Sequence, residues 1–185
     1  QLISESQQLH ATIDFDQDVA YRRVAPQADP LLKAIGKLSA TVWDGSLGFA
    51  RDAVFLAQRG FSVQGFERNP LMYLLLKEAH ARTASDWAVR LEIGFGNITD
   101  QLKQPVGDIV IYFDPLFELA RSKSKSRKEM EILKEFGADE DLQKVFDQLL
   151  AARPRRLVVK RADKAPTLGR AIHSVVGKTV RFDIY

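Results

Sequence analysis

Residues 40–67 read ATVWDGSLGFARDAVFLAQRGFSVQGFE, and this stretch gives the clearest indication of the fold class. An apolar run ends at Asp44, a helical pattern stops at Gly60, and a second apolar run ends at Glu67. Glycine directly after a helical pattern is a common signal for a helix C-terminus. A strand, a helix and a strand in this order form the unit from which parallel sheets are built. The stretch therefore predicts two parallel strands that each end in a carboxylate.

The same alternation continues along the chain. Asn69-Pro70 predicts the start of a helix, because asparagine is a good N-cap and proline is accepted in the first turn. Residues 89–93 and 156–160 are predicted as strands, residues 139–152 as a helix with an acidic first turn, and residues 180–185 as a terminal strand. Together these elements indicate an α/β fold with an open, mostly parallel sheet.

A third carboxylate follows a further strand, in the stretch IVIYFDPLFELARSKSKSRKEM at residues 109–130. The strand predicted over residues 108–113 has an unbroken apolar run from residue 109 to residue 113, as expected of a strand covered on both faces. It ends at Asp114-Pro115. Parallel strands end along one edge of a sheet, and ligands bind at that edge. We therefore expect Asp44, Glu67 and Asp114 to surround one crevice.

Charge is distributed unevenly along the chain. Residues 1–120 contain 11 Lys/Arg and 15 Asp/Glu, a net of −4, whereas residues 121–185 contain 16 and 9, a net of +7. A basic C-terminal part favours a polyanionic partner such as nucleic acid, and a solvated basic surface is the alternative.

Other compositional features exclude several classes of site. The chain has no cysteine, so it has neither disulfides nor thiolate metal ligands. His10, His80 and His173 are widely separated and show no metal-ligand spacing, so no metal is expected. No apolar run approaches the roughly 18 residues of a membrane span, and no signal peptide is visible. We therefore expect a cytoplasmic protein with no membrane partner.

Two turns contain residues that are suited to a binding or catalytic role. The turn after the first strand, DGSLGFARD at residues 44–52, resembles the D-x-x-x-G-x-G turn of S-adenosylmethionine-dependent methyltransferases, with Ala50 at the last glycine. Small residues let the backbone approach a ligand closely. Glu67 stands where a carboxylate can accept hydrogen bonds from both hydroxyls of a ribose, although a helix-capping acid is the alternative.

The second turn is Asp114-Pro115-Leu116-Phe117, which resembles the Asp/Asn-Pro-Pro-aromatic turn of amino-methyltransferases. The lone pair of an exocyclic base amine is delocalised into the ring, so the amine is a poor nucleophile. A carboxylate that accepts the amine hydrogens favours a pyramidal nitrogen, and an aromatic ring stacks on the base. A strand end followed by a proline turn is the structural alternative.

With these turns, nearly the whole chain resembles the RsmJ-type small-subunit ribosomal RNA guanine-N2 methyltransferases. The resemblance implies a Rossmann-like class I methyltransferase fold, with a mostly parallel sheet, helices on both faces and an antiparallel C-terminal strand. It also implies a methyltransferase domain at residues 37–185 after an N-terminal extension at residues 1–36. The shared motifs are IDF at 13–15, YRR at 21–23, RDA at 51–53, ERNP at 67–70, DPxF at 114–117, KEM at 128–130, GADED at 137–141, VVKR at 158–161, AP at 165–166 and RFDIY at 181–185.

The resemblance also implies the site. The cofactor S-adenosylmethionine is expected to contact Asp44, Gly48, Arg51, Asp52, Glu67, Arg68, Gly96, Asn97 and Asp114. The catalytic turn is implied to consist of Asp114, Pro115 and Phe117. RNA phosphates are expected to contact Arg121, Lys123, Lys125, Arg127, Lys128, Arg155, Lys160 and Arg161. A solvated linker is the alternative for the basic loop at residues 121–128.

The implied reaction transfers a methyl group to the exocyclic N2 amine of a guanine in small-subunit ribosomal RNA. The implied partner is ribosomal RNA or the small ribosomal subunit. Two alternatives stay open. The same turn would serve another amino substrate, adenine N6 or a protein glutamine. The chain also departs from the family pattern at Ala50, Gly96-Asn97 and Glu118, which leaves room for a catalytically silent RNA-binding or assembly factor on the same fold.

Overall fold

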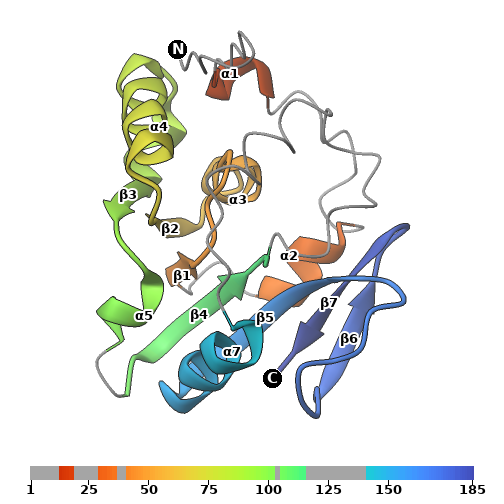
Figure 1. The fold of residues 1–185 in the computed structure, drawn as a ribbon. Helices are drawn as coiled ribbons and strands as arrows, with labels where there is room; N and C mark the ends of the chain where they lie inside the picture. The colour runs from red at the N-terminus through yellow and green to blue at the C-terminus, as the bar shows by residue number, and fades with distance from the viewer. Residues whose placement is uncertain (1–12, 19–28, 37–40, 103–104, 116–140) are drawn as a thin grey trace, which may run out of the picture.

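A seven-stranded sheet forms the centre of the molecule (Figure 1), in the strand order β3-β2-β1-β4-β5-β7-β6. The computed structural model describes residues 13–18, 29–36, 41–102, 105–115 and 141–185. The five strands from β3 to β5 are parallel, whereas β7 is antiparallel to β5 and β6 is antiparallel to β7. The expected parallel sheet with an antiparallel C-terminal strand is confirmed. The strands are β1 (Thr41–Asp44), β2 (Ser62–Glu67), β3 (Leu91–Phe95), β4 (Gly107–Phe113), β5 (Pro154–Ala162), β6 (His173–Val176) and β7 (Val180–Ile184).

Helices cover both faces of the sheet. Within the described residues, none is long and apolar enough to span a membrane. The helical elements are α1 (Phe15–Asp18), α2 (Pro30–Ile35), α3 (Arg51–Gln58), α4 (Pro70–Arg82), the 3₁₀ helix η3 (Asp86–Arg90), α5 (Ile98–Gln101) and α7 (Leu142–Ala151).

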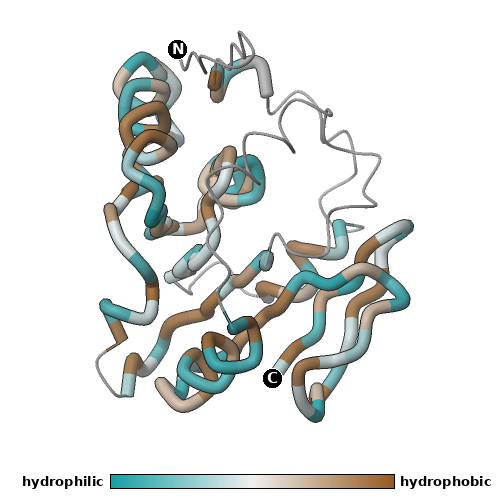
Figure 2. Tube along the Cα trace, in the orientation of Figure 1, coloured by the Kyte–Doolittle hydropathy of each residue, from teal (hydrophilic) through white to brown (hydrophobic). Residues whose placement is uncertain are grey.

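Strand β4 shows how the two faces are filled. Val110 and Tyr112 belong to one buried cluster, which includes residues of α2, α3 and α4. Ile111 and Phe113 belong to a second cluster with residues of α5 and α7. Successive side chains of a strand point to opposite faces, so a strand between two helical layers is apolar throughout. Figure 2 shows this concentration of hydrophobic residues along β4.

The helix start at Asn69-Pro70 is confirmed, whereas α7 begins at Leu142 and not at residue 139, and its first turn contains no acidic residue. The Asn69 side chain accepts hydrogen bonds from the amides of Leu71 and Met72, and Pro70 occupies the first position of α4. Asp141 caps α7 in the same way. The side-chain oxygens satisfy amides that have no partner inside the helix.

Some elements differ from the sequence expectation. Strand β3 begins at Leu91 and not at residue 89, because η3 extends to Arg90. Strand β6 was not expected. It is one of the two edge strands of the sheet. Its residues are exposed or half-buried, and so its sequence lacks the apolar pattern that marks the inner strands. Ile13 and Phe15 pack into the same cluster as α2, and the domain boundary at residue 36 stays a prediction.

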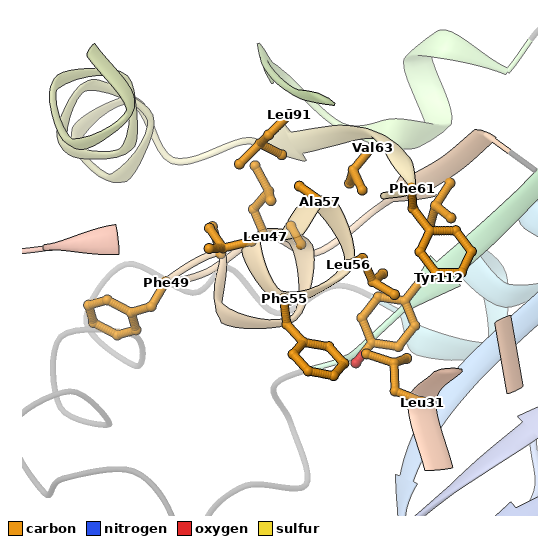
Figure 3. Close-up of a cluster of buried hydrophobic side chains, with 14 of the residues drawn as sticks. Leu31, Leu47, Phe49, Phe55, Leu56, Ala57, Phe61, Val63, Leu91 and Tyr112 are labelled. Carbon is orange, nitrogen blue, oxygen red and sulfur yellow. The ribbon is translucent and has the colours of Figure 1, made fainter. Parts of the chain in front are cut away.

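One contact between β2 and the turn after β1 depends on glycine. Leu47 belongs to the buried cluster that Figure 3 shows. A Cβ atom built on Gly65 would lie 2.4 Å from Leu47 Cδ2 and 2.6 Å from its Cγ. The absence of a side chain at Gly65 therefore lets the turn at residues 45–50 lie directly on β2.

We expect Gly65→Ala to lower the free energy of unfolding by about 1–3 kcal/mol, because the new methyl group overlaps a buried leucine. Gly94→Ala is the matched control in β3, where the nearest atoms to a new Cβ would lie 3.6 Å away, an ordinary contact. Its stability should change by less than about 0.5 kcal/mol. Urea denaturation of both variants measures the difference, and equal stabilities would contradict the contact.

Candidate active site

Three carboxylates gather at the carboxyl edge of the sheet, as the sequence predicts. Asp44 ends β1, Glu67 ends β2 and Asp114 directly follows β4. These three strands are parallel neighbours, so their ends lie along the same edge (Figure 1). Asp44 is 2% exposed and Glu67 9% exposed, and the Asp114 side chain is 15% exposed. Carboxylates buried to this degree require compensating donors.

The turn after β1 supplies some of these donors. The Ser46 amide donates to Asp44 Oδ1 at 3.0 Å. Gly48 has a φ of 51°, and a Cβ atom built on it would have no neighbour within 4 Å. Ala50 also adopts a left-handed conformation, with a φ of 56°. An L-residue in this region costs about 1 kcal/mol, which gives a physical reason for the glycine that the methyltransferase pattern has there.

Glu67 joins three turns of the site. Its Oε2 accepts from the Gly48 amide at 3.2 Å, and its Oε1 accepts from the Asn69 amide at 2.8 Å. Its backbone carbonyl accepts from the Gly96 amide at 3.0 Å. Burial raises the pKa of Glu67, whereas the two amide bonds and the nearby Arg68 oppose this rise. The carboxylate is therefore held in place from two sides.

The backbone around Glu67 leaves room for a ligand. Gly96 has a φ of 119°, and a Cβ atom on it would have no neighbour within 4 Å, as at Gly48. Asn97 follows and precedes α5. Arg68 directly follows β2 and is half-buried. Two glycines with open space on either side of a fixed carboxylate are suited to a nucleoside, whose ribose hydroxyls would donate to the carboxylate.

Asp44 is the most strongly perturbed acid of the site. Its pKa is raised to about 7, chiefly by burial and to a smaller extent by the nearby Asp52 and Asp114, while the Ser46 amide and Lys160 oppose this rise. Asp44 therefore changes charge near neutral pH, in the part of the sheet edge between the Glu67 turn and Asp114.

Lys160 of β5 connects the remaining acids. Its Nζ donates to Asp114 Oδ2 at 2.8 Å and to Asp52 Oδ2 at 2.9 Å. Tyr112, which is buried in β4, donates its hydroxyl to the same Asp52 oxygen at 2.6 Å. The Asp114 amide donates to Ser46 Oγ at 2.6 Å. Asp114 is thus fixed through both its backbone and its side chain.

Two of the predicted RNA contacts in the described residues take part in the fold. Arg161 is 3% exposed and donates to the carbonyl of Pro166 at 2.7 Å. Arg155 lies at the opposite end of β5 from Lys160, near the start of β4, where it pairs with Asp108 at 3.0 Å. The roles of Arg155, Lys160 and Arg161 in RNA binding stay predictions.

The structure locates the remaining predicted residues as follows. Pro115 is buried next to Asp114. Arg51 begins α3, with its guanidinium carbon 5.8 Å from the centre of the Phe49 ring, and Asp52 lies in the same first turn. The described part of the chain contains no group of three or more histidines, aspartates or glutamates suited to a metal ion. Outside the described residues lie Phe117, Glu118, Arg121, Lys123, Lys125, Arg127 and Lys128.

Sequence reasoning missed Ser46 and Tyr112 and did not assign Lys160 to the centre of the site. Lys160 could have been located by the period-two pattern of β5. Arg156, Val158 and Lys160 share one face of that strand, and Val158 packs in the cluster that also contains α3. No comparable pattern identifies the hydroxyls of Ser46 and Tyr112.

The donor set fits S-adenosylmethionine (SAM). This cofactor carries a ribose diol, an adenine and a methionine moiety with a positively charged sulfur. Glu67 is suited to the diol, the open backbone at Gly48 and Gly96 to a close approach, and the acids Asp44, Asp52 and Asp114 to a cation.

Comparison with known proteins agrees with this fit. The family model described as "Putative SAM-dependent methyltransferase" matches residues 1–185. Ribosomal RNA small subunit methyltransferase J of Bdellovibrio bacteriovorus is 38% identical over 183 residues, which cover 94% of this chain and 73% of the relative. The protein of the same name from Thioalkalivibrio sulfidiphilus is 34% identical over 178 residues, which cover 88% and 69%.

A solved structure shares the fold. The crystal structure of a SAM-dependent methyltransferase from Neisseria gonorrhoeae aligns with a TM-score of 0.71 and 27% sequence identity, covering 100% of this chain and 77% of that chain. The sheet order, the carboxylates at its edge and these similarities agree. The chain belongs to the family of SAM-dependent methyltransferases.

Proposed function

We propose that the chain transfers a methyl group from SAM to the exocyclic N2 amine of a guanine in small-subunit ribosomal RNA. The observation that carries the proposal is the Asp114 carboxylate, held by Lys160 at the end of β4 and followed by Pro115. The relatives named ribosomal RNA small subunit methyltransferase J support the class of substrate. The reaction would take place in the cytoplasm, and residues 37–185 would form the methyltransferase domain after an extension at residues 1–36.

The first task of the chain is to hold the cofactor. When bound, SAM supplies a methyl group on a positively charged sulfur. Glu67 would accept hydrogen bonds from the ribose hydroxyls, and the open backbone near Gly48 and Gly96 would allow the nucleoside to approach closely. Arg51 and Asp52, at the start of α3, would contact the cofactor as well. The ionised acids Asp44, Asp52 and Asp114 would then offset the positive charge of the sulfur.

The second task is to prepare the amine. Asp114 Oδ2 already accepts from Lys160. No other described residue donates to the Asp114 side chain, so Oδ1 is available to accept an N–H of the target amine. SAM would supply the methyl group to the amine nitrogen, and the electron pair of the broken carbon–sulfur bond would remain on sulfur. The nitrogen then loses a proton, and Asp114 or water can accept it.

The third task is to hold RNA. Phosphate contacts by lysine and arginine supply affinity and salt dependence, whereas the pocket selects the base. We assign the phosphate contacts to the basic loop at residues 121–128, whose charges are Arg121, Lys123, Lys125, Arg127 and Lys128. Phe117 would stack on the target base, which would be unstacked from its neighbours.

Ribosomal RNA from a strain in which the gene is deleted should lack one methyl group on one guanine, and mass spectrometry of RNA fragments measures this loss. Reintroducing the wild-type gene should restore the methyl group, and a gene carrying Asp114→Asn should not. Loss of a methyl group from a DNA adenine or a protein glutamine would instead support another amino substrate. Unchanged methylation of all three would favour a catalytically silent factor.

We expect Asp114→Asn to lower kcat by about 100-fold or more, because an amide accepts the amine hydrogens and the released proton poorly. Asp108→Asn is the matched control, since Asp108 belongs to the same strand, has a side chain that is 74% exposed, and lies far from the site edge. Its kcat should stay within about 2-fold of wild type. Equal turnover by the Asp114 variant and the wild type would remove Asp114 from the mechanism.

The pKa of Asp44 predicts a pH dependence of cofactor binding. Asp44 is neutral below about pH 7 and charged above it. The affinity for the positively charged SAM should therefore increase as the pH rises through about 7, and more than the affinity for S-adenosylhomocysteine, which lacks the sulfonium charge. Isothermal titration calorimetry across this range measures both ligands. Asp44→Asn should remove the difference in pH dependence, and an equal pH dependence of both ligands in the wild type would contradict the assignment.

A further inference from the structure

We propose that Lys160 is a positioning residue for methyl transfer, which holds the Asp114 carboxylate toward the target amine by bridging it to Asp52 of helix α3. The inference rests on the proposed function. It concerns a residue that the sequence assigns to the RNA backbone, and it gives that residue a role inside the site.

The location of Lys160 supports this role. It lies near the end of β5, beside Phe182 of β7 in the sheet register, and its side chain is 18% exposed. Alternation along β5 places it on the face that α3 covers, and the ammonium reaches both the α3 residue Asp52 and the β4 end at Asp114. Three separate elements of the fold therefore meet at one nitrogen atom.

The contacts of the ammonium make a phosphate an unsuitable partner. Two of the three ammonium hydrogens are directed at carboxylate oxygens, which lie 2.8 and 2.9 Å from Nζ. Burial alone would lower the pKa of Lys160, but Asp114 and Asp52 outweigh burial and raise it, so the charge is retained. A phosphate would have to displace a carboxylate, leaving that acid partly buried without its cation. Such a loss is costly.

The bridge through Lys160 also fixes the orientation of the Asp114 carboxylate. Asp52 Oδ2 accepts from both Lys160 and the buried Tyr112, so the ammonium is held against an anchored acid. The Asp114 amide is held by Ser46 Oγ. With its Oδ2 bound to Lys160 and its backbone bound to Ser46, the Asp114 carboxylate has little rotational freedom, and Oδ1 remains for the amine. A displacement of about 1 Å at such a group can cost about 100-fold in rate.

Lys160 has an electrostatic effect as well. Asp44, Asp52 and Asp114 interact, since Asp52 and Asp114 both raise the pKa of Asp44 while Lys160 lowers it. Removing the ammonium would leave three acids facing one another, and the group would then take up a proton more readily. A site that needs ionised acids would lose activity at a higher pH than before.

The test compares Lys160→Met, Lys160→Arg and the control Lys164→Met. The control removes an equal charge from the exposed residue four positions further along the chain, beyond β5. We expect Lys160→Met to lower kcat by about 100-fold and to shift the acidic limb of the kcat–pH profile upward by about one pH unit or more. Its KM for RNA and the salt dependence of RNA binding should stay near those of wild type. Lys160→Arg should leave the acidic limb of the kcat–pH profile near its wild-type position. Lys164→Met should leave both kcat and the position of the acidic limb unchanged.

Two outcomes would overturn the proposal. If Lys160 contacts a phosphate, the methionine variant will keep kcat at saturating RNA, raise KM, and lower the slope of log affinity against log salt by about one. If Lys160 is only structural, the melting temperature and the active fraction of the Lys160→Met variant will fall, while the acidic limb of its kcat–pH profile will stay in place.

A separate readout distinguishes failure of the proposed function. If wild-type protein methylates no RNA, calorimetric binding of S-adenosylmethionine still reports the charge of the acids. Lys160→Met should then shift the midpoint of the pH dependence of binding upward from about 7, the pKa of Asp44. An unshifted midpoint would refute the link between Lys160 and the acids, whatever the substrate is.

Discussion

The structure depends on the compensation of buried negative charge at one edge of the sheet. Parallel strands deliver Asp44, Glu67 and Asp114 to that edge, and each carboxylate has lost most of its water. Backbone amides from two turns compensate Glu67, and one amide compensates Asp44. Lys160 compensates Asp114 and the adjacent Asp52. These donors are fixed by the fold, so the site needs little reorganisation when a cation arrives, and such preorganisation is a main source of electrostatic catalysis.

Compensation is incomplete at Asp44, and this has a consequence for stability. The folded pKa of about 7 lies above the ordinary aspartate value of 3.8, so the folded chain binds a proton more tightly than the unfolded chain does. Stability contributed by this proton is present at acidic pH and decreases as the pH rises from about 4 to about 7. The site is therefore less stable at the pH where its carboxylate is charged. A cofactor that carries positive charge would offset this loss, so the acid is better explained by binding than by folding.

Sequence reasoning predicted the strand ends well and the connections between them poorly. Asp44, Glu67 and Asp114 could be located because each follows an apolar run, and runs of this kind reflect burial between two helical layers. The bond between Lys160 and Asp52 joins residues 108 positions apart, and that between Tyr112 and Asp52 joins residues 60 positions apart. Such pairs depend on the angle at which α3 crosses the sheet, which no local pattern records. The burial of Arg161 was missed for a similar reason, because arginine in a basic segment resembles a surface residue until its carbonyl partner is known.

Lys160 also connects two parts of the proposed site, the side of the cofactor and the side of the target base. This connection bears on the order in which the two would bind. Asp52 belongs to α3, which begins after the turn that would hold the cofactor, whereas Asp114 belongs to the turn that would face the base. A single ammonium shared between them makes the position of one acid depend on the other. A cationic cofactor next to Asp52 would compete with Lys160 for that carboxylate and leave the ammonium more strongly bound to Asp114. Occupation of the cofactor side would then tighten the orientation of Asp114 before the base arrives. In the proposed site, the shared lysine would thus provide a direct physical route, through two ion pairs of less than 3 Å, from cofactor binding to the orientation of Asp114.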